Sequence, residues 1–178
     1  DFLGRSRFGK DIKISVPPTV LVTAMAKVPD VTKTISSDFQ KEGDSIYLLG
    51  RSQRDLGGSE LEDAFGLPTS LLRTAPPVDG ERNLRLYRTL HQAIQRGLLR
   101  SAHDCSEGGF LVALAESAIG GMLGVNAEIE HWGDGWNATM AEFFFNETPG
   151  RFVVSVAPEK EEEFRKFFSG QAVLRIGK

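Results

Sequence analysis

The stretch "LLRSAHDCSEGGFLVALAESAIGG", residues 98–121, contains the transition on which the fold prediction depends. Its first seven residues are apolar or extended in character and predict a strand, whereas the residues that follow predict a helix. Ser106 is placed to cap the N-terminus of that helix, and Gly120 and Gly121 are placed to end it. A strand that runs through a short polar loop into a helix is typical of a layered domain of sheet and helices.

Further elements of both kinds alternate on either side of this stretch. Five more apolar or β-branched segments predict strands, and we expect the first of them to be buried on both faces: residues 19–28, 45–50, 123–130, 151–158 and 172–178. Helices are predicted at residues 59–65, 81–98 and 159–168. The fold class that follows is α/β of the α+β type, a layered domain with a mixed β-sheet packed by helices.

Two local patterns complete this prediction. Residues 1–18 are polar and contain several Gly and Pro residues, which indicates a leading segment with a short hairpin around "RFGK". Within residues 81–98, five side chains recur at helical spacing and predict the buried face of the longest helix: Leu84, Tyr87, His91, Ile94 and Leu98.

Composition limits the classes of protein to which the chain can belong. Its 178 residues suffice for one domain with a substantial core, and the whole of residues 1–178 is expected to form a single domain. The net charge of −3 argues against nucleic acid as a partner, and no apolar run approaches the ~20 residues that span a bilayer. A single cysteine, Cys105, fits the reducing cytoplasm. Because the chain begins with Asp1 and ends on a strand pattern, we expect it to be part of a longer protein.

The first candidate site is the Gly-Gly-Ser of "RDLGGSELEDAFG", residues 54–66. Adjacent glycines allow close approach of a ligand to the backbone, and amides that lead into a helix can bind an anion. Gly57, Gly58 and Ser59 therefore form a candidate phosphate cradle. The alternative is a tight turn with Ser59 as a plain helix cap, and the acidic Glu60 beside it favours that alternative.

The second candidate site is the loop of "SAHDCSEGGF", residues 101–110. His103, Asp104 and Ser106 stand at the end of a strand, where ligand-binding groups collect. The alternative is that Asp104 or Ser106 caps the helix while His103 bonds a buried carbonyl. Cys105 is not a candidate nucleophile, since its neighbours in an extended segment point to the opposite face.

A third segment, "FFFNETPGRFVV", carries Glu147 and Arg151 on either side of a Pro-Gly turn, and a buried pair between them would fix that turn. The role of the loop "HWGDGWNAT" stays open. The sequence has no Walker A pattern, no GxGxxG and no Cys/His spacing typical of zinc, so no metal ligand is proposed.

Four stretches together resemble the C-terminal AIR-synthase-related region of phosphoribosylformylglycinamidine synthases: "PPTVLVTAMAKVPDV", "DSIYLLGRSQRDLGGSEL", "LHQAIQRGLLRSAHDCSEGGFLVALAESAIGGMLG" and "FNETPGRFVVSV". The resemblance implies an enzyme of purine biosynthesis that makes formylglycinamidine ribonucleotide from formylglycinamide ribonucleotide, ATP and glutamine. It implies that Gly57, Gly58 and Ser59 bind the 5′-phosphate of the ribonucleotide. Asp104, Ser106 and His103 would line or support the cleft.

The resemblance also implies how the work is divided. ATP and Mg²⁺ would be held mainly by an AIR-synthase N-type domain of the same protein, so this chain alone is expected to be inactive. A glutaminase domain or subunit would supply ammonia, and a homodimer is one candidate assembly. Two alternatives stay open: aminoimidazole ribonucleotide synthetase or another enzyme on the same scaffold, and a non-catalytic scaffold half of such an enzyme.

Overall fold

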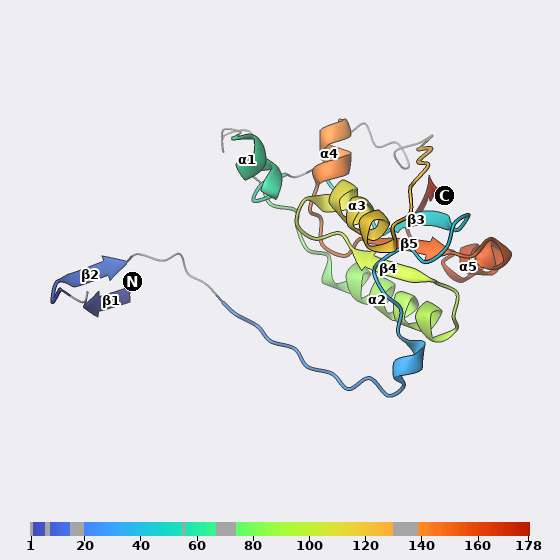
Figure 1. The fold of residues 1–178 in the computed structure, drawn as a ribbon, viewed down its shortest axis with the longest axis horizontal. Coiled ribbons are helices and arrows are strands. Elements are labelled where there is room, and N and C mark those ends of the chain that lie inside the picture. The colour runs from blue at the N-terminus through green and yellow to red at the C-terminus, as the bar shows by residue number, and fades with distance from the viewer. Residues whose placement is uncertain (1, 6–7, 15–19, 55, 67–73, 130–138) are drawn as a thin grey trace. The chain divides into compact units, whose positions relative to one another are not determined.

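The computed structural model describes residues 2–5, 8–14, 20–54, 56–66, 74–129 and 139–178 (Figure 1). The chain divides into two compact units, residues 1–31 and residues 32–178. Among the described residues, no helix has both the length and the apolar character needed to cross a membrane. The predicted loop at residues 131–139 falls almost entirely outside the described residues.

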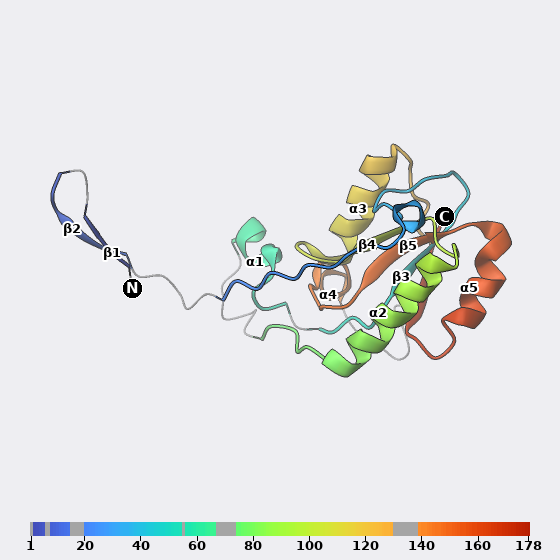
Figure 2. The same cartoon turned by 90° about the horizontal axis from the view of Figure 1, so that it is seen from below.

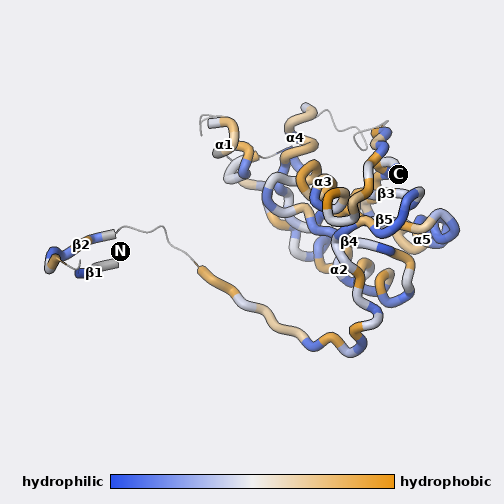
Figure 3. Tube along the Cα trace, in the orientation of Figure 1, coloured by the Kyte–Doolittle hydropathy of each residue, from blue (hydrophilic) through white to orange (hydrophobic). Residues whose placement is uncertain are grey.

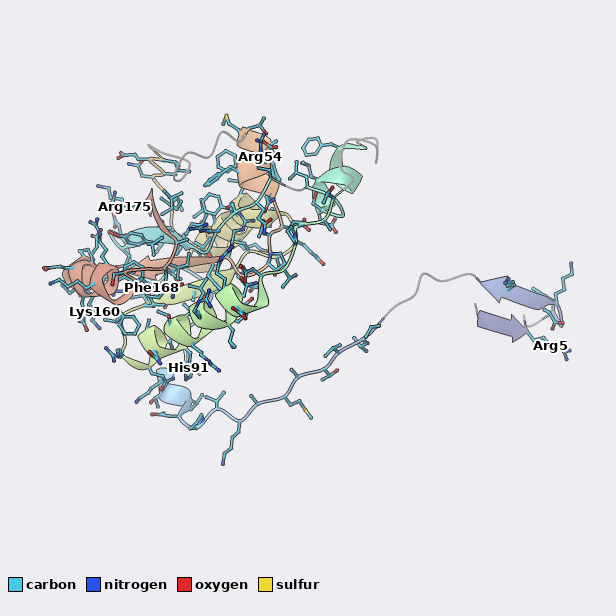
Figure 4. The ribbon with its side chains drawn as sticks, turned by 180° about the vertical axis from the view of Figure 1, so that it is seen from behind. Arg5, Arg54, His91, Lys160, Phe168 and Arg175 are labelled. Atoms are coloured by element: carbon cyan, nitrogen blue, oxygen red, sulfur yellow. The ribbon has the colours of Figure 1, made fainter. Side chains whose placement is uncertain are left out.

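The first unit contains the expected hairpin. Strands β1 (Phe2–Arg5) and β2 (Asp11–Ile14) pair antiparallel, with Phe2 opposite Ile14 and Arg5 opposite Asp11. The Arg5 guanidinium, labelled in Figure 4, lies 3.4 Å from the Asp11 carboxylate across the end of the ladder. The prediction of a hairpin in the leading segment is therefore confirmed.

The predicted buried strand at residues 19–28 is wrong for the described residues 20–28, which form neither helix nor strand. Figure 3 shows how apolar this segment is. Its large side chains are nonetheless 81–94% exposed at Val20, Leu21, Val22 and Met25. β-Branched residues favour an extended backbone, but a strand also needs a partner for its amides and carbonyls. The sequence pattern indicates an extended backbone, but it does not show whether a partner strand is present.

The second unit is built on a four-stranded sheet in the order β4-β5-β3-β6. All three pairings are antiparallel, and within the described part of the chain the parallel component of the expected mixed sheet is one bridge between Ser36 and Ser101. Three of the predicted strands are confirmed with slightly shorter bounds, and a fourth is the strand of the opening stretch: β3 (Ser45–Leu49), β5 (Phe152–Val156), β6 (Val173–Gly177) and β4 (Ser101–Asp104).

Helices cover both faces of this sheet, as Figures 1 and 2 show. One core joins Tyr47 and Leu49 of β3 to helices α2 (Gly80–Gln95) and α5 (Glu161–Phe167). The other joins Ile46 and Leu48 of β3 to α3 (Gly109–Gly121) and α4 (Met140–Phe145). Alternate residues of one strand thus point to opposite faces, and both are apolar because both faces are covered. The predicted layered fold class is confirmed.

Polar side chains bond to one another where the start of helix α5 meets strands β3 and β6. The hydroxyls of Ser45 and Tyr47 both donate to the Glu161 carboxylate, and Arg175 of β6 lies 3.6 Å from it. Figure 4 labels Arg175 on the same side of the molecule as Phe168 and Lys160. Burial, together with the bond to Glu161, raises the pKa of Tyr47 to about 12, so the phenol stays protonated.

The buried face of α2 differs from the predicted one. Leu86, Leu90 and Ala93 face the core, whereas Leu84 is 48% exposed and Tyr87 is 41% exposed. Apolar residues occupy two adjacent stripes of this helix, so spacing alone does not decide which stripe is buried. Only the distal part of the predicted stripe, Ile94 and Leu98, packs into the core.

Two smaller predictions near α3 are also wrong. Gly108, in the left-handed conformation with φ of 75°, is the N-cap of α3 instead of Ser106, whereas the helix ends at Gly121 as predicted, with Met122 as the C-cap. Residues 123–129 form no strand, although Ala127 bridges Gly177 and the Glu128 amide donates to the Ile176 carbonyl of β6 over 2.8 Å. A glycine N-cap has no side-chain acceptor for the first amides of the helix, which must bond elsewhere.

The corrected face of α2 can be tested with two leucine truncations. Leu90→Ala should lower the free energy of unfolding by about 2–5 kcal/mol because it opens a cavity in the core. Leu84→Ala on the exposed stripe should change it by less than about 0.5 kcal/mol. Urea denaturation followed by circular dichroism measures both, and equal losses would restore the face predicted from spacing.

Candidate functional site

An open cavity of about 520 Å³ lies where two loops and one helix meet. The loop after β4, the turn before β5 and the α2 side chain Tyr87 provide its lining: Tyr87, Asp104, Cys105, Ser106, Glu147, Pro149, Gly150, Arg151 and Phe152. Tyr87 packs edge-on against Phe152, with 5.7 Å between ring centroids. Of the described candidate residues, Asp104 and Ser106 line this cavity, whereas His103, Gly57, Gly58 and Ser59 do not.

Asp104 and Ser106 act as a pair at the mouth of the β4 loop. The Ser106 hydroxyl donates to the Asp104 carboxylate, and this bond is the main reason why the pKa of Asp104 is lowered. His103 contributes less, from 3.6 Å away. Asp104 is thus an exposed carboxylate that stays ionised and carries a neighbouring hydroxyl. Such a pair can accept hydrogen bonds from the hydroxyls of a polar ligand.

His103 faces away from the cavity. Its Nε2 lies 2.9 Å from the Glu116 carboxylate on α3, and its buried Nδ1 has no hydrogen-bond partner among the described residues. Two carboxylates, those of Glu116 and Asp104, therefore flank this ring on different sides. Cys105 is buried, and burial raises the pKa of its thiol to about 11. The thiol is therefore protonated near neutral pH, in agreement with the prediction that it is not a nucleophile.

The Gly57 and Ser59 donors of the Gly-Gly-Ser turn already bond protein carbonyls. The Gly57 amide donates to the Thr74 carbonyl over 2.9 Å. The Ser59 amide and hydroxyl both donate to the Leu56 carbonyl, over 3.3 Å and 2.6 Å. Ser59 is buried, whereas Gly58 is exposed with a φ of 72°. The turn precedes helix α1 (Glu60–Phe65), which is one residue shorter than predicted.

Glu147 brings the two glycine loops together. Its Oε1 accepts from the Glu60 amide at the start of α1 and from the Gly108 amide before α3, each over 2.8 Å. The two amide nitrogens therefore lie within two hydrogen-bond lengths of each other, although they are far apart in the sequence. The two motifs, which the sequence presents as separate candidates, thus belong to one region of the molecule.

The expected Glu147–Arg151 ion pair is not formed among the described residues. Arg151 is fully buried and donates to the carbonyls of Asn146 and Thr148 and to the Ser52 hydroxyl. Burial lowers the pKa of Arg151, and the nearby Glu147 charge opposes that change. The turn is fixed as expected, but by carbonyls instead of a carboxylate.

Sequence reasoning left Asn146 and Thr148 without a role and assigned Glu147 only to a pair with Arg151. The Asn146 side chain accepts from both the amide and the hydroxyl of Thr148, and the same hydroxyl accepts from the Gln53 amide over 2.9 Å. The available signal was three consecutive polar residues after three phenylalanines, a sequence that also fits a glycosylation pattern. Arg54, which is labelled in Figure 4, forms an ion pair with Glu142 of α4 over 3.2 Å.

Comparison with known proteins places the chain in a family. The profile described as "AIR synthase related protein, C-terminal domain" matches residues 41–178, and the chain belongs to that family. Phosphoribosylformylglycinamidine synthase subunit PurL of Carboxydothermus hydrogenoformans is 40% identical over 168 residues, which is 92% of this chain and 22% of that protein. The PurL subunit of Thermococcus sibiricus is 33% identical over 91% of this chain and 22% of its own length. The chain thus spans about a fifth of these relatives.

Solved structures show the same fold. A structure described as T. maritima PurL complexed with FGAR has a TM-score of 0.66 and 18% identity, over 83% of this chain and 26% of that one. The hydrogenase maturation protein HypE has a TM-score of 0.52 and 17% identity, over 81% and 46%. At these identities the likeness concerns the fold alone, and it confirms the AIR-synthase-like fold expected from the sequence.

The close approach of backbone at Gly109 predicts a difference between two glycines. Both Gly58 and Gly109 have positive φ, so replacement of either by alanine should cost roughly 1 kcal/mol of backbone strain. At Gly109 the new Cβ would also collide with the carbonyls of Asn146 and Phe144, which adds roughly 1–3 kcal/mol. Chemical denaturation of the two variants measures this, and an equal loss in both would contradict the packing of α3 on that turn.

The Asp104–Ser106 bond predicts a change in acidity. Ser106→Ala should raise the pKa of Asp104 towards its ordinary value, because the bond that favours the carboxylate is lost. A carboxyl-detected NMR titration measures it. Asp38, whose pKa is lowered by Ser36, serves as an internal reference and should not move. An unchanged Asp104 pKa would show that the hydroxyl does not bond the carboxylate in solution.

Proposed function

We propose that this chain is the C-terminal-type domain of a phosphoribosylformylglycinamidine synthase. The proposed reaction converts formylglycinamide ribonucleotide to formylglycinamidine ribonucleotide, with ATP as the energy source and glutamine-derived ammonia as the nitrogen donor. The observation that carries the proposal is the 33–40% identity to PurL subunits across about nine tenths of the chain. The match of residues 41–178 to the AIR-synthase-related family supports it.

The proposal places the binding site for formylglycinamide ribonucleotide on this chain and the binding site for ATP on another domain. Structures described as T. maritima PurL complexed with ATP and with AMPPCP show that this relative binds ATP. Among the described residues of this chain, no group of three His, Cys, Asp or Glu side chains is placed to hold a metal ion. We accordingly propose that the ATP and Mg²⁺ sites lie on an AIR-synthase N-type domain.

The ribonucleotide contacts that we propose are those of the two loops. Asp104 and Ser106 line the cavity and offer an acceptor and a hydroxyl to the ligand. Gly57, Gly58 and Ser59 are proposed for the 5′-phosphate, with the exposed Gly58 as the point of first contact. The Ser59 hydroxyl donates to Leu56 and cannot at the same time donate to a phosphate. Phosphate binding through Ser59 therefore requires this turn to rearrange. His103 is proposed as a support for Asp104 from behind.

The proposed partners follow from the same assignment. An N-type domain would complete the cleft, and a glutaminase domain or subunit would deliver ammonia. The exposed apolar side chains of residues 20–28 offer surface that a further domain could cover. We further propose a cytoplasmic location, a homodimer as one assembly, and a single domain over residues 1–178 with residues 1–18 as its entry segment.

Two alternatives remain to be separated by experiment. An aminoimidazole ribonucleotide synthetase would share the fold and the phosphate loop but close a ring on formylglycinamidine ribonucleotide. A non-catalytic scaffold half would bury the partner domain and bind no ribonucleotide at Gly57–Ser59. The likeness to HypE shows that this scaffold also occurs in a hydrogenase maturation protein.

The deciding measurement is ADP release by the full-length protein with ammonium as nitrogen donor. Formylglycinamide ribonucleotide and formylglycinamidine ribonucleotide are offered separately. We expect turnover with the first only, because the chain matches the amidine synthases. Turnover with only the second would transfer the assignment to the ring-closing enzyme. Catalysis without any requirement for the Gly57–Ser59 loop would favour the scaffold alternative.

A further inference from the structure

One carboxylate oxygen links the two loops that contain the candidate site. Glu147 Oε1 accepts from the Glu60 amide and from the Gly108 amide over 2.8 Å each. Both amides belong to first turns of helices, where backbone donors lack partners within the helix and a negative charge is favoured. Gly108 caps α3 without a side-chain hydrogen bond of its own, and Glu147 accepts from the backbone amide of this cap residue.

The base that carries Glu147 is rigid. Asn146 and Thr148 on either side are buried and bonded to each other. The buried Arg151 donates to the carbonyls of both residues. Gly109 lies so close to the Asn146 carbonyl that a side chain would collide with it. The Glu147 carboxylate therefore projects from a fixed platform towards two loops, one of which is packed against that platform.

We propose that Glu147 is a positioning residue that sets the distance between the Gly57–Ser59 turn and the Asp104–Ser106 loop. This inference rests on the proposed function, because it assigns the two loops to one ribonucleotide. Binding of a ligand that spans two loops depends on their separation, and errors of about 1 Å are costly. The carboxylate acts through the loops: a negative charge that touched the phosphate directly would repel it.

Because helix α1 is short, its position depends on the hydrogen bond from Glu60 to Glu147. Helix α1 has six residues, and helices of this length need contacts outside themselves to be stable. The Glu60–Glu147 bond supplies such a contact at its first residue, next to Ser59. The packed helix α3 thereby determines where the short helix α1 begins. Loss of the carboxylate should release the turn more than it releases α3.

The experiment compares Glu147→Ala and Glu147→Gln in the full-length protein. Because two charge-assisted bonds are lost, Glu147→Ala should raise KM for formylglycinamide ribonucleotide by at least roughly tenfold. It should change kcat by less than about threefold, because no reacting atom is touched. Glu147→Gln keeps an acceptor oxygen and should restore most of the affinity. Glu163→Gln, an exposed glutamate on α5, is the matched control and should leave both constants unchanged.

A second measurement does not depend on activity. Hydrogen–deuterium exchange should become faster in the peptides that contain Glu60 and Gly108 in Glu147→Ala, and remain unchanged in the control. An unchanged KM in an active Glu147→Ala enzyme, or exchange that rises at only one of the two amides, would overturn the inference. A wild-type protein that does not consume formylglycinamide ribonucleotide would instead refute the proposed function, and the exchange data would still test the link.

Discussion

The cavity depends on the hydrogen bonds that the buried guanidinium of Arg151 donates. The guanidinium has no exposed surface and bonds the carbonyls of Asn146 and Thr148 and the hydroxyl of Ser52. An arginine stays charged in proteins, so the structure keeps a positive charge inside by surrounding it with carbonyl dipoles. The Glu147 charge helps from outside hydrogen-bond range, since it opposes the lowering of the Arg151 pKa by burial. Asn146, Thr148 and Arg151 of this turn are thereby buried, whereas Pro149 stays exposed.

The central sheet fixes the position of the loop after β4 relative to the turn that contains Arg151. Asp104 stands opposite Phe152 in the β4–β5 ladder, and the Cys105 amide donates to the Arg151 carbonyl over 2.9 Å. The register is fixed because Val153 points to one core and Val154 to the other, so a slip by one residue would exchange the two faces. The position of Asp104 and Ser106 at the cavity is therefore a consequence of sheet register, and not of the loop sequence alone.

Sequence patterns predicted what depends on neighbouring residues and failed where a distant partner decides. The strand of residues 45–49 and the leading hairpin each follow from local spacing or turn chemistry. The stripe of α2 and the segment of residues 20–28 depend on what packs against them, which spacing does not reveal. The same limit applies to the site: the glycine motifs were recognisable, but the carboxylate that joins them belongs to a third segment. The pattern predicts Ser106 as a helix cap, although its hydroxyl bonds Asp104.

The two loops of the candidate site differ in the number of buried contacts that hold the helix after each of them. The loop before α3 precedes a thirteen-residue helix whose Phe110, Ala113 and Leu114 lie in a core. The turn before α1 precedes a six-residue helix with Leu61 as its buried apolar anchor among the described side chains. Segments with few buried contacts open at low free-energy cost, and ligand-binding loops are commonly of this kind. The donors of Gly57 and Ser59 already bond the Thr74 and Leu56 carbonyls, and this is compatible with a role in binding because the turn is the part of the candidate site that can rearrange most easily. Glu147 would limit that rearrangement to the donors while it keeps the start of α1 in place.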